Sequence, residues 1–317
     1  MSLVSRTNHF SDEQKGPARK RRQLWLRARM IQIIRNFFIE RDYLEVETPQ
    51  LIPAPPPEPH IEAISADGGY LHTSPELYMK RLLAAGYSRI FQITKSFRSG
   101  ERGSFHLPEF TLLEWYRSQI EYKALMEECE VLMLSVSEGL GNDRKIHYQG
   151  RVISLDSPWD RIKVSEAFDR FAPIPLEMAM ENGRFDEIMA SDIEPNLGLE
   201  RPVFLYDYPA CLASLARLKA GDSRYAERFE IYIAGLELAN GFSELTDPLE
   251  QKSRFERDRQ ERQASGKQVY PMPERFLEAL EYMPEAAGIA LGMDRLAMVF
   301  IDSDIIDDVV PFPPEEL

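Results

Sequence analysis

Residues 89–117, RIFQITKSFRSGERGSFHLPEFTLLEWYR, constrain the fold of this chain more than any other stretch. Apolar and polar residues alternate over Arg89–Phe97, and apolar residues return over Phe110–Tyr116, which predicts two strands. The connection between them is polar and carries Arg98 and Glu101 among other charges. We therefore expect an antiparallel hairpin with a charged loop.

This charged loop has two explanations. Charged loops are most often solvated turns. The same side chains would also suit a loop that closes over a phosphorylated ligand, with Arg98 at its base, because arginine binds phosphate through paired hydrogen bonds. Taken alone, the charge of the loop favours the solvated turn. Residues elsewhere in the chain are needed to distinguish the two explanations.

Hairpin patterns dominate elsewhere as well. One is expected over residues 61–73, around Asp67-Gly68-Gly69, and another over Lys145–Leu155. Helical patterns separate them, and the charged segment Pro248–Ala264 is most simply a solvated surface helix. Hairpins outnumber strand–helix–strand units, so the sequence predicts an α+β fold, an antiparallel sheet flanked by helices. We expect a flexible arm over residues 1–18 and one domain over residues 19–317.

Charge and cysteine content narrow the function. With 38 basic and 52 acidic side chains the net charge is −14, so non-specific binding of nucleic acid is not expected. Cys129 and Cys211 are too few and too far apart for a disulfide framework, which favours a reduced, cytoplasmic setting. No run of residues is long enough to span a membrane. The five histidines lack ligand spacing, so no zinc site is predicted.

Glu237 and Glu244 form a first candidate site. If Asn240-Gly241 is a hairpin turn, the two acids lie opposite each other. If the turn is at Ala234-Gly235, both lie on one strand, and only a bulge, which Asn240-Gly241 would supply, lets them share a face. Paired carboxylates suit Mg²⁺ or an ammonium group. Two solvent-facing acids on an edge strand explain the spacing equally well.

A second candidate is Gly288–Arg295, GIALGMDR. It matches neither a dinucleotide-binding loop nor a P-loop. Small residues at alternate strand positions would let a ligand lie flat on the sheet, and Arg295, one turn into a helix, would reach a phosphate. As an isolated pattern, close packing of a helix on a strand explains it better.

Together these stretches resemble the catalytic core of class II aminoacyl-tRNA synthetases of the lysyl type. The resemblance covers residues ~20–313, and its three motifs are jointly specific. The matching stretches are Phe37–Pro49 for the first motif, Phe97–Glu114 for the second and Gly288–Arg295 for the third, together with Ser74–Tyr78, Glu237–Glu244 and Asp308–Pro313.

Two departures point to one branch of that family. Only about twenty residues precede the first helix, which leaves no room for the anticodon-binding OB-fold of lysyl-tRNA synthetases. Ala290 also replaces a glycine of their third motif. Both features resemble the elongation factor P–(R)-β-lysine ligase family. Membership implies ATP-dependent formation of a β-lysyl adenylate, transfer to a lysine side chain of elongation factor P, Mg²⁺ as cofactor, and a homodimer.

The resemblance also implies roles for individual residues. Arg98 would clamp the α-phosphate, Arg295 the γ-phosphate, and Phe110 would stack on adenine. The second motif departs from its usual form at Ser99-Gly100 and Leu107, and the role of its usual acid passes either to Glu101 or to the main chain. The residues implied for catalysis are Arg98, Glu237 and Arg295, and those implied for the metal are Glu237 and Glu244. The residues implied for binding the amino acid are Ser74, Pro75, Glu76, Tyr116, Glu244 and Ala290. The residues implied for binding ATP are Arg98, Ser99, Gly100, Glu101, His106, Leu107, Phe110, Glu237, Leu238, Gly292 and Arg295.

Two alternatives remain at this point. One is a truncated lysyl-tRNA synthetase that acts on tRNA, which the acidic charge disfavours. The other is a non-catalytic, synthetase-like sensor of amino acid or nucleotide, which would not need to retain both Arg98 and Arg295.

Overall fold

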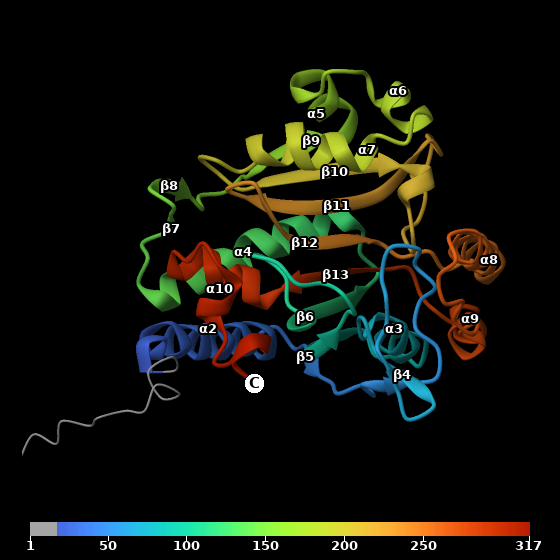
Figure 1. The fold of residues 1–317 in the computed structure, drawn as a ribbon, viewed down its shortest axis with the longest axis horizontal. Coiled ribbons are helices and arrows are strands. Elements are labelled where there is room, and N and C mark those ends of the chain that lie inside the picture. The colour runs from blue at the N-terminus through green and yellow to red at the C-terminus, as the bar shows by residue number, and fades with distance from the viewer. Residues whose placement is uncertain (1–17) are drawn as a thin grey trace, which may run out of the picture.

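The computed structural model describes residues 18–317, in which one large sheet carries helices on both faces (Figure 1). All but the last residue of the predicted arm 1–18 lies outside the described residues. The eight strands follow the order β1-β5-β6-β13-β12-β11-β10-β9. Their bounds are β1 Leu44–Glu45, β5 Arg89–Phe97, β6 Glu109–Ser118, β9 Asp160–Lys163, β10 Val203–Pro209, β11 Tyr225–Ile233, β12 Leu236–Ser243 and β13 Ala286–Gly292.

The predicted hairpin of residues 89–117 is confirmed as β5 and β6. They pair antiparallel from Arg89 opposite Arg117 to Phe97 opposite Glu109. The predicted α+β fold is confirmed too, although the sheet is mixed rather than wholly antiparallel. β1 pairs with β5, and β9 with β10, in parallel. The first connection contains one helix, Glu76–Ala84, and the second contains several short helices; parallel neighbours require such a crossover.

Helices cover the two faces of the sheet with different cores. On one face, α2 (Arg21–Ile39), α4 (Tyr122–Leu140) and α10 (Met293–Ile301) share the largest hydrophobic cluster with the central strands. On the other, α3 (Glu76–Ala84), α8 (Pro248–Ala264) and α9 (Glu274–Leu280) form a second cluster that includes Tyr116. Within residues 18–317, no helix is both long and apolar enough to cross a membrane.

Smaller elements complete the fold. The predicted hairpins near residues 67 and 150 are confirmed, the first within a three-stranded sheet and the second as a two-stranded one. Short helices between β9 and β10 form a separate core against β10. The bounds are β2 Leu51–Ile52, β3 Ser65–Ala66, β4 Gly69–Leu71, β7 Lys145–Tyr148, β8 Arg151–Ser154, α5 Val164–Phe171, α6 Leu176–Glu181 and α7 Phe185–Ile188.

Helix α8 departs from the expected solvated helix. Asp247 caps it by accepting from the amides of Leu249 and Glu250. However, Arg254 and Arg262 are 6% and 0% exposed. Both donate to backbone carbonyls of loops beside the sheet. The mixture of acidic and basic residues along α8 therefore does not mean that every charged side chain is solvated. A guanidinium group can donate its hydrogen bonds to carbonyl oxygens inside the fold.

Gly288 allows a close approach at the centre of the sheet. A Cβ atom there would overlap the buried ring of Tyr116 and come within 2.6 Å of Glu244 Oε1. We expect Gly288→Ala to lower the free energy of unfolding by about 1–3 kcal/mol, because the overpacked ring has no free space to enter. Urea unfolding measures this change.

Gly103→Ala is a matched control, since its new Cβ would meet no atom closer than His106 Nδ1 at 4.0 Å. Equal stabilities of the Gly288→Ala and Gly103→Ala variants would contradict this account of Gly288.

Candidate functional site

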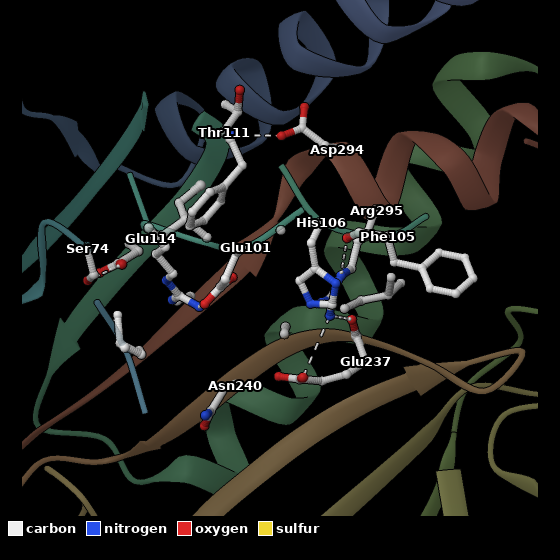
Figure 2. A pocket seen from close by; sticks show the side chains of 18 of the residues that line it. Ser74, Glu101, Phe105, His106, Thr111, Glu114, Glu237, Asn240, Asp294 and Arg295 are labelled. Atoms are coloured by element: carbon white, nitrogen blue, oxygen red, sulfur yellow. Dashed lines mark hydrogen bonds and ion pairs between the residues drawn. The ribbon is translucent and has the colours of Figure 1, made fainter. Parts of the chain in front are cut away.

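A cavity of about 430 Å³ opens on the face of the sheet between the β5–β6 loop and β12 (Figure 2). A row of paired residues crosses five strands beneath it, from β5 to β11, and its middle members Glu114, Ala290 and Asn240 line the cavity. The predicted residues that line it are Ser74, Glu76, Arg98, Glu101, His106, Leu107, Phe110, Glu237, Leu238, Ala290, Gly292 and Arg295, whereas Pro75, Ser99, Gly100, Tyr116 and Glu244 do not. The paired row is Gln92, Glu114, Ala290, Asn240 and Glu230.

Arg98 leaves the end of β5 and enters the cavity. Its guanidinium carbon lies 5.1 Å from the centre of the Phe110 ring, and Nη1 lies 3.7 Å from Glu101 Oε1. Its Nε is buried without a hydrogen-bond partner. Arg98 is thus held between an aromatic face and a partly exposed acid, with donors left for an anionic ligand.

Arg295 faces the cavity from the first turn of α10. Its Nη1 donates to the Glu237 carbonyl at 2.8 Å and its Nε to the Phe105 carbonyl at 3.2 Å. Its Nη2 lies 2.5 Å from His106 Nε2 (Figure 2). Burial and the nearby Arg295 charge lower the pKa of His106, so its neutral ring accepts this hydrogen bond. These contacts join the β5–β6 loop, β12 and α10 around one cation.

Asp294 fixes the start of α10 to β6. Its Oδ2 accepts from the Thr111 amide at 2.7 Å, and its Oδ1 from Arg27 at 2.6 Å. Asp294 is 2% exposed, so this pairing lies inside the fold. The ion pair sets the position of Arg295, the next residue, relative to the hairpin that carries Arg98. The sequence analysis did not assign Asp294 a role.

The structure has the turn at Ala234-Gly235. Glu237 therefore lies on β12, and Glu244 directly follows that strand. The register between β11 and β12 shifts so that Ile231 pairs with Ala239 but Tyr232 with Glu237. Leu238 is therefore the bulged residue, not Asn240-Gly241 as the second alternative required. The two acids nevertheless have different neighbours, and only Glu237 lines the cavity.

Glu237 lies in a group of acidic and basic side chains. Burial and the charge of Glu230 raise its pKa, while Arg295 and Arg228 oppose that shift. Glu230 accepts from Arg228 at 2.6 Å and from the Tyr232 hydroxyl at 2.7 Å. Glu237 is the acid of this group that lines the cavity, and its carboxylate oxygens are donors suited to a hard divalent cation.

Beyond Ala290, the cavity ends in buried acids. Glu114 is fully buried, and it accepts from the Ser74 hydroxyl at 2.6 Å and from the Tyr116 hydroxyl at 2.7 Å. Burial, followed by the charge of Glu76, raises the pKa of Glu114 to about 7. Tyr116 thus contacts the cavity through Glu114 rather than lining it. This end suits a cationic group that supplies the missing positive charge.

Lys80 holds two of the predicted acids. Its Nζ lies 2.5 Å from Glu76 Oε1 and 2.5 Å from Glu244 Oε2, and its side chain is 1% exposed. Burial raises the pKa of Glu244 to about 8, and Lys80 opposes that shift. Glu244 is therefore paired inside the protein, below the cavity rather than on its surface.

Sequence reasoning assigned no site role to several cavity residues, although some left a signal. Glu114 is an acid within the apolar run LLEWY, which is typical of a functional carboxylate. Lys80 follows Glu76 by one helical turn. Arg228 and Glu230 left no such signal, because only the fold brings Arg228 to the cavity and Glu230 into contact with it. The cavity residues without a predicted role are Glu58, Glu114, Arg228, Asn240 and Asp294. Lys80 and Glu230 also had none, and they contact the cavity residues Glu76 and Arg228.

Comparisons with known proteins agree with this site. The family of class II tRNA synthetases (D, K and N) matches residues 15–316. The elongation factor P–(R)-β-lysine ligase of Vibrio atlanticus (strain LGP32) is 40% identical over 314 residues, which cover 94% of this chain and 97% of that protein. That of Proteus mirabilis (strain HI4320) is 42% identical over 303 residues, 90% of this chain and 93% of that protein. The chain therefore belongs to the class II tRNA synthetase family and, within it, to the elongation factor P–(R)-β-lysine ligases.

Proposed function

We propose that this protein activates (R)-β-lysine with ATP and transfers it to a lysine side chain of elongation factor P. One observation carries the proposal: a single cavity has two arginines at one end and buried carboxylates at the other. The negatively charged phosphate chain of ATP matches the arginines, and the two ammonium groups of a diamino acid match the carboxylates. The names of the relatives specify the amino acid and the acceptor protein.

The reaction has two steps. The amino-acid carboxylate attacks the α-phosphorus of ATP in line, which forms an acyl–adenylate bond and releases pyrophosphate. The neutral amine of the acceptor lysine then attacks the acyl carbon, loses a proton, and releases AMP. The protein's part is mainly to position the reactants and to stabilise charge.

At the nucleotide end, we assign the α-phosphate to Arg98 and the γ-phosphate to Arg295. Phe110 offers a ring face to adenine, and Gly292 leaves space above the sheet, since a Cβ there would meet no atom closer than 3.7 Å. The cavity lining proposed for ATP also includes Glu101, His106, Leu107 and Leu238. Main-chain contacts from Ser99 and Gly100 to ATP remain part of the proposal.

We propose Mg²⁺ at Glu237, which lines the cavity, whereas Glu244 is paired with Lys80 and does not line it. The ion would neutralise phosphate charge when bound. No cluster of three or more metal-binding side chains occurs in residues 18–317, so phosphate and water would complete the ligand set.

At the amino-acid end, we assign the distal ammonium to Glu114, which Ser74 and Tyr116 hold by hydrogen bonds. Glu76 is placed for the other amino group, and Pro75 sets the first turn of its helix. Glu244 acts through Lys80, which it holds below Glu76. This changes the expected direct contact of Glu244 with the substrate.

We further propose that residues 19–317 work as one catalytic domain, in the cytoplasm, where a translation factor is the acceptor. A homodimer is also proposed. Trp25, Ile39 and Leu44 in and after α2 are 67%, 57% and 49% exposed. Exposed apolar side chains on α2 and on the first-motif segment that follows from its end support a subunit contact there.

ATP–pyrophosphate exchange with β-lysine, followed by transfer of labelled β-lysine to elongation factor P or to tRNA, tests the function. We expect exchange and labelling of elongation factor P alone. Labelling of tRNA instead would identify a synthetase, and the absence of exchange with any amino acid would identify a sensor.

Arg98→Lys tests the phosphate contact. Lysine keeps the charge but loses the planar pair of donors, so we expect the exchange rate to fall by roughly 10²–10³-fold. Arg117→Lys on β6 is the matched control, because Arg117 does not line the cavity. Equal rates in the two variants would argue against a role for Arg98 in phosphate binding.

Activity should depend on pH through the buried acids. Burial raises the pKa values of Glu114 and Glu58 to about 7, with Glu76 adding to both shifts. Carboxylates bind ammonium only when ionised, so kcat/KM for β-lysine should rise about 10-fold between pH 6 and pH 8. The apparent pKa belongs to the group of acids together. A flat profile, with the melting temperature constant over the same range, would contradict this assignment.

Ala290 lies between Glu114 and Asn240 on the cavity floor and is suited to discriminate between lysine isomers. Removing the methyl group of Ala290 makes room near the carboxylate of the substrate. The amino group of α-lysine lies one carbon closer to that carboxylate than the amino group of β-lysine does. We expect Ala290→Gly to raise α-lysine activation relative to β-lysine by about 10-fold or more. Exchange assays with both isomers measure the ratio.

Ala287→Gly serves as the control for Ala290→Gly, because Ala287 is buried on the same strand and does not line the cavity. A ratio that changes equally in both variants would remove Ala290 as a specificity residue.

A further inference from the structure

We propose that Glu58, together with Glu76, binds the amino group that lies nearer to the carboxylate of the substrate; this inference rests on the proposed function. Glu58 belongs to the proline-rich loop between β2 and β3. Its side chain lines the cavity with Glu76 and Arg98. It is thereby a residue for substrate specificity that lies outside the three motifs.

The position of Glu58 matches the chemistry of a β-amino acid. Glu58 lines the cavity together with Glu76, Arg98 and Arg228. Arg98 is the residue assigned to the reacting phosphate, so the carboxylate of the amino acid must lie beside it. A carboxyl group that shares the cavity with both Arg98 and Glu76 is therefore suited to an amino group on the carbons nearest the substrate carboxylate, where the β-amino group is found.

Glu58 also lacks an internal cation. The Ser214 hydroxyl donates to its Oε1 at 3.4 Å, and within residues 18–317 it forms no ion pair. Lys80, by contrast, is already taken by Glu76 and Glu244. Burial then raises the pKa of Glu58 to about 7, which is the expected result for a carboxyl group without a partner. An ammonium group from the substrate supplies the charge that the fold does not.

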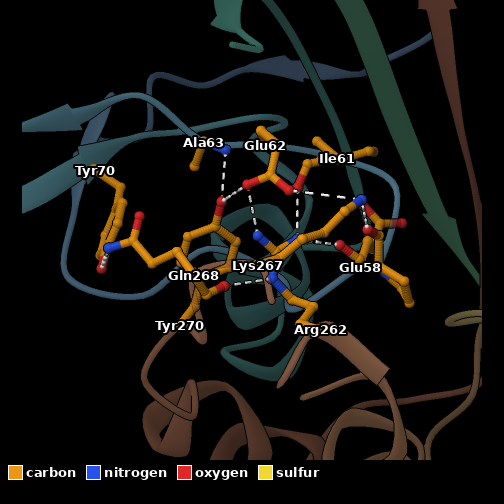
Figure 3. A network of polar contacts seen from close by, with 10 residues as sticks. Glu58, Ile61, Glu62, Ala63, Tyr70, Arg262, Lys267, Gln268 and Tyr270 are labelled. Carbon is orange, nitrogen blue, oxygen red and sulfur yellow. Dashed lines mark hydrogen bonds and ion pairs between the residues drawn. The ribbon is translucent and has the colours of Figure 1, made fainter. Parts of the chain in front are cut away.

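The fold holds this loop firmly in place. Buried Arg262 of α8 donates to the Glu58 carbonyl at 2.7 Å and to the Ile61 carbonyl at 2.9 Å (Figure 3). Lys267 donates to the Pro59 carbonyl at 2.7 Å. Glu62 accepts from Arg262 at 2.6 Å and from the Tyr270 hydroxyl at 3.1 Å, so the network closes on itself (Figure 3).

Helix α8 also supports the segment that carries Ser214, the hydrogen-bond donor to Glu58. Arg254 donates to the carbonyls of Ser214 and Ala216, each at 2.8 Å. Two buried arginines of α8 thus fix both the loop that carries Glu58 and the segment that carries its hydrogen-bond donor. Such rigid support is typical of a side chain whose position matters for binding.

Glu58→Gln tests the inference, because it keeps the shape of the side chain and removes its charge. In ATP–pyrophosphate exchange we expect KM for β-lysine to rise about 10-fold or more, while kcat changes by less than about threefold. Glu58→Asp keeps the charge and should restore most of the affinity. Glu261→Gln, which neutralises an exposed acid of α8, should behave as the unmodified protein.

A ligand without the proximal amino group separates direct contact from a general charge effect. The probe is 6-aminohexanoate, which retains only the distal ammonium of β-lysine. Its inhibition constant should change by less than about twofold in Glu58→Gln. The inference is overturned if KM for β-lysine is unchanged, or if 6-aminohexanoate loses as much affinity as β-lysine. Absence of exchange in the unmodified protein would instead overturn the proposed function, before any variant is compared.

Discussion

The site depends on one constraint, the small size of the residues that β13 presents to the cavity. This strand lies between β6 and β12, and its alternate residues on that face are Gly288, Ala290 and Gly292. At Gly288 the missing side chain makes room for Tyr116 and Glu244. At Ala290 and Gly292 the space belongs to the cavity. Larger side chains at these positions would fill the place where the two substrates must meet.

A second constraint is the balance of charge below that strand. Burial and the charge of Glu76 raise the pKa values of Glu114 and Glu244, and the buried cation Lys80 opposes both shifts. Burying several carboxylates costs free energy unless cations or hydrogen bonds compensate. Lys80 compensates for part of this charge. Under the proposed function a diammonium substrate would supply the remainder, so the same imbalance of charge would favour the correct ligand.

Much of the fold could be predicted from local patterns. The β5–β6 hairpin followed from alternation of apolar residues, and the α+β fold followed from the number of hairpins. The parallel edge strands were missed because β1 and β9 are short and their partners are set by crossovers. The solvated character assigned to α8 was wrong for Arg254 and Arg262. Hydrophobic pattern does not reveal a charge that is buried against carbonyl groups.

The sequence by itself determined the chemical parts of the site, namely Arg98, Arg295 and Glu237, because their motifs are local and their spacing is specific. Only the tertiary structure decided how those parts combine. It placed Glu114 and Asn240 on either side of Ala290, paired Glu244 with Lys80 rather than with Glu237, and brought Glu58 to the cavity. These relations depend on strand register and on contacts between segments far apart in the chain, and a one-residue change in register would turn each side chain to the other face of the sheet.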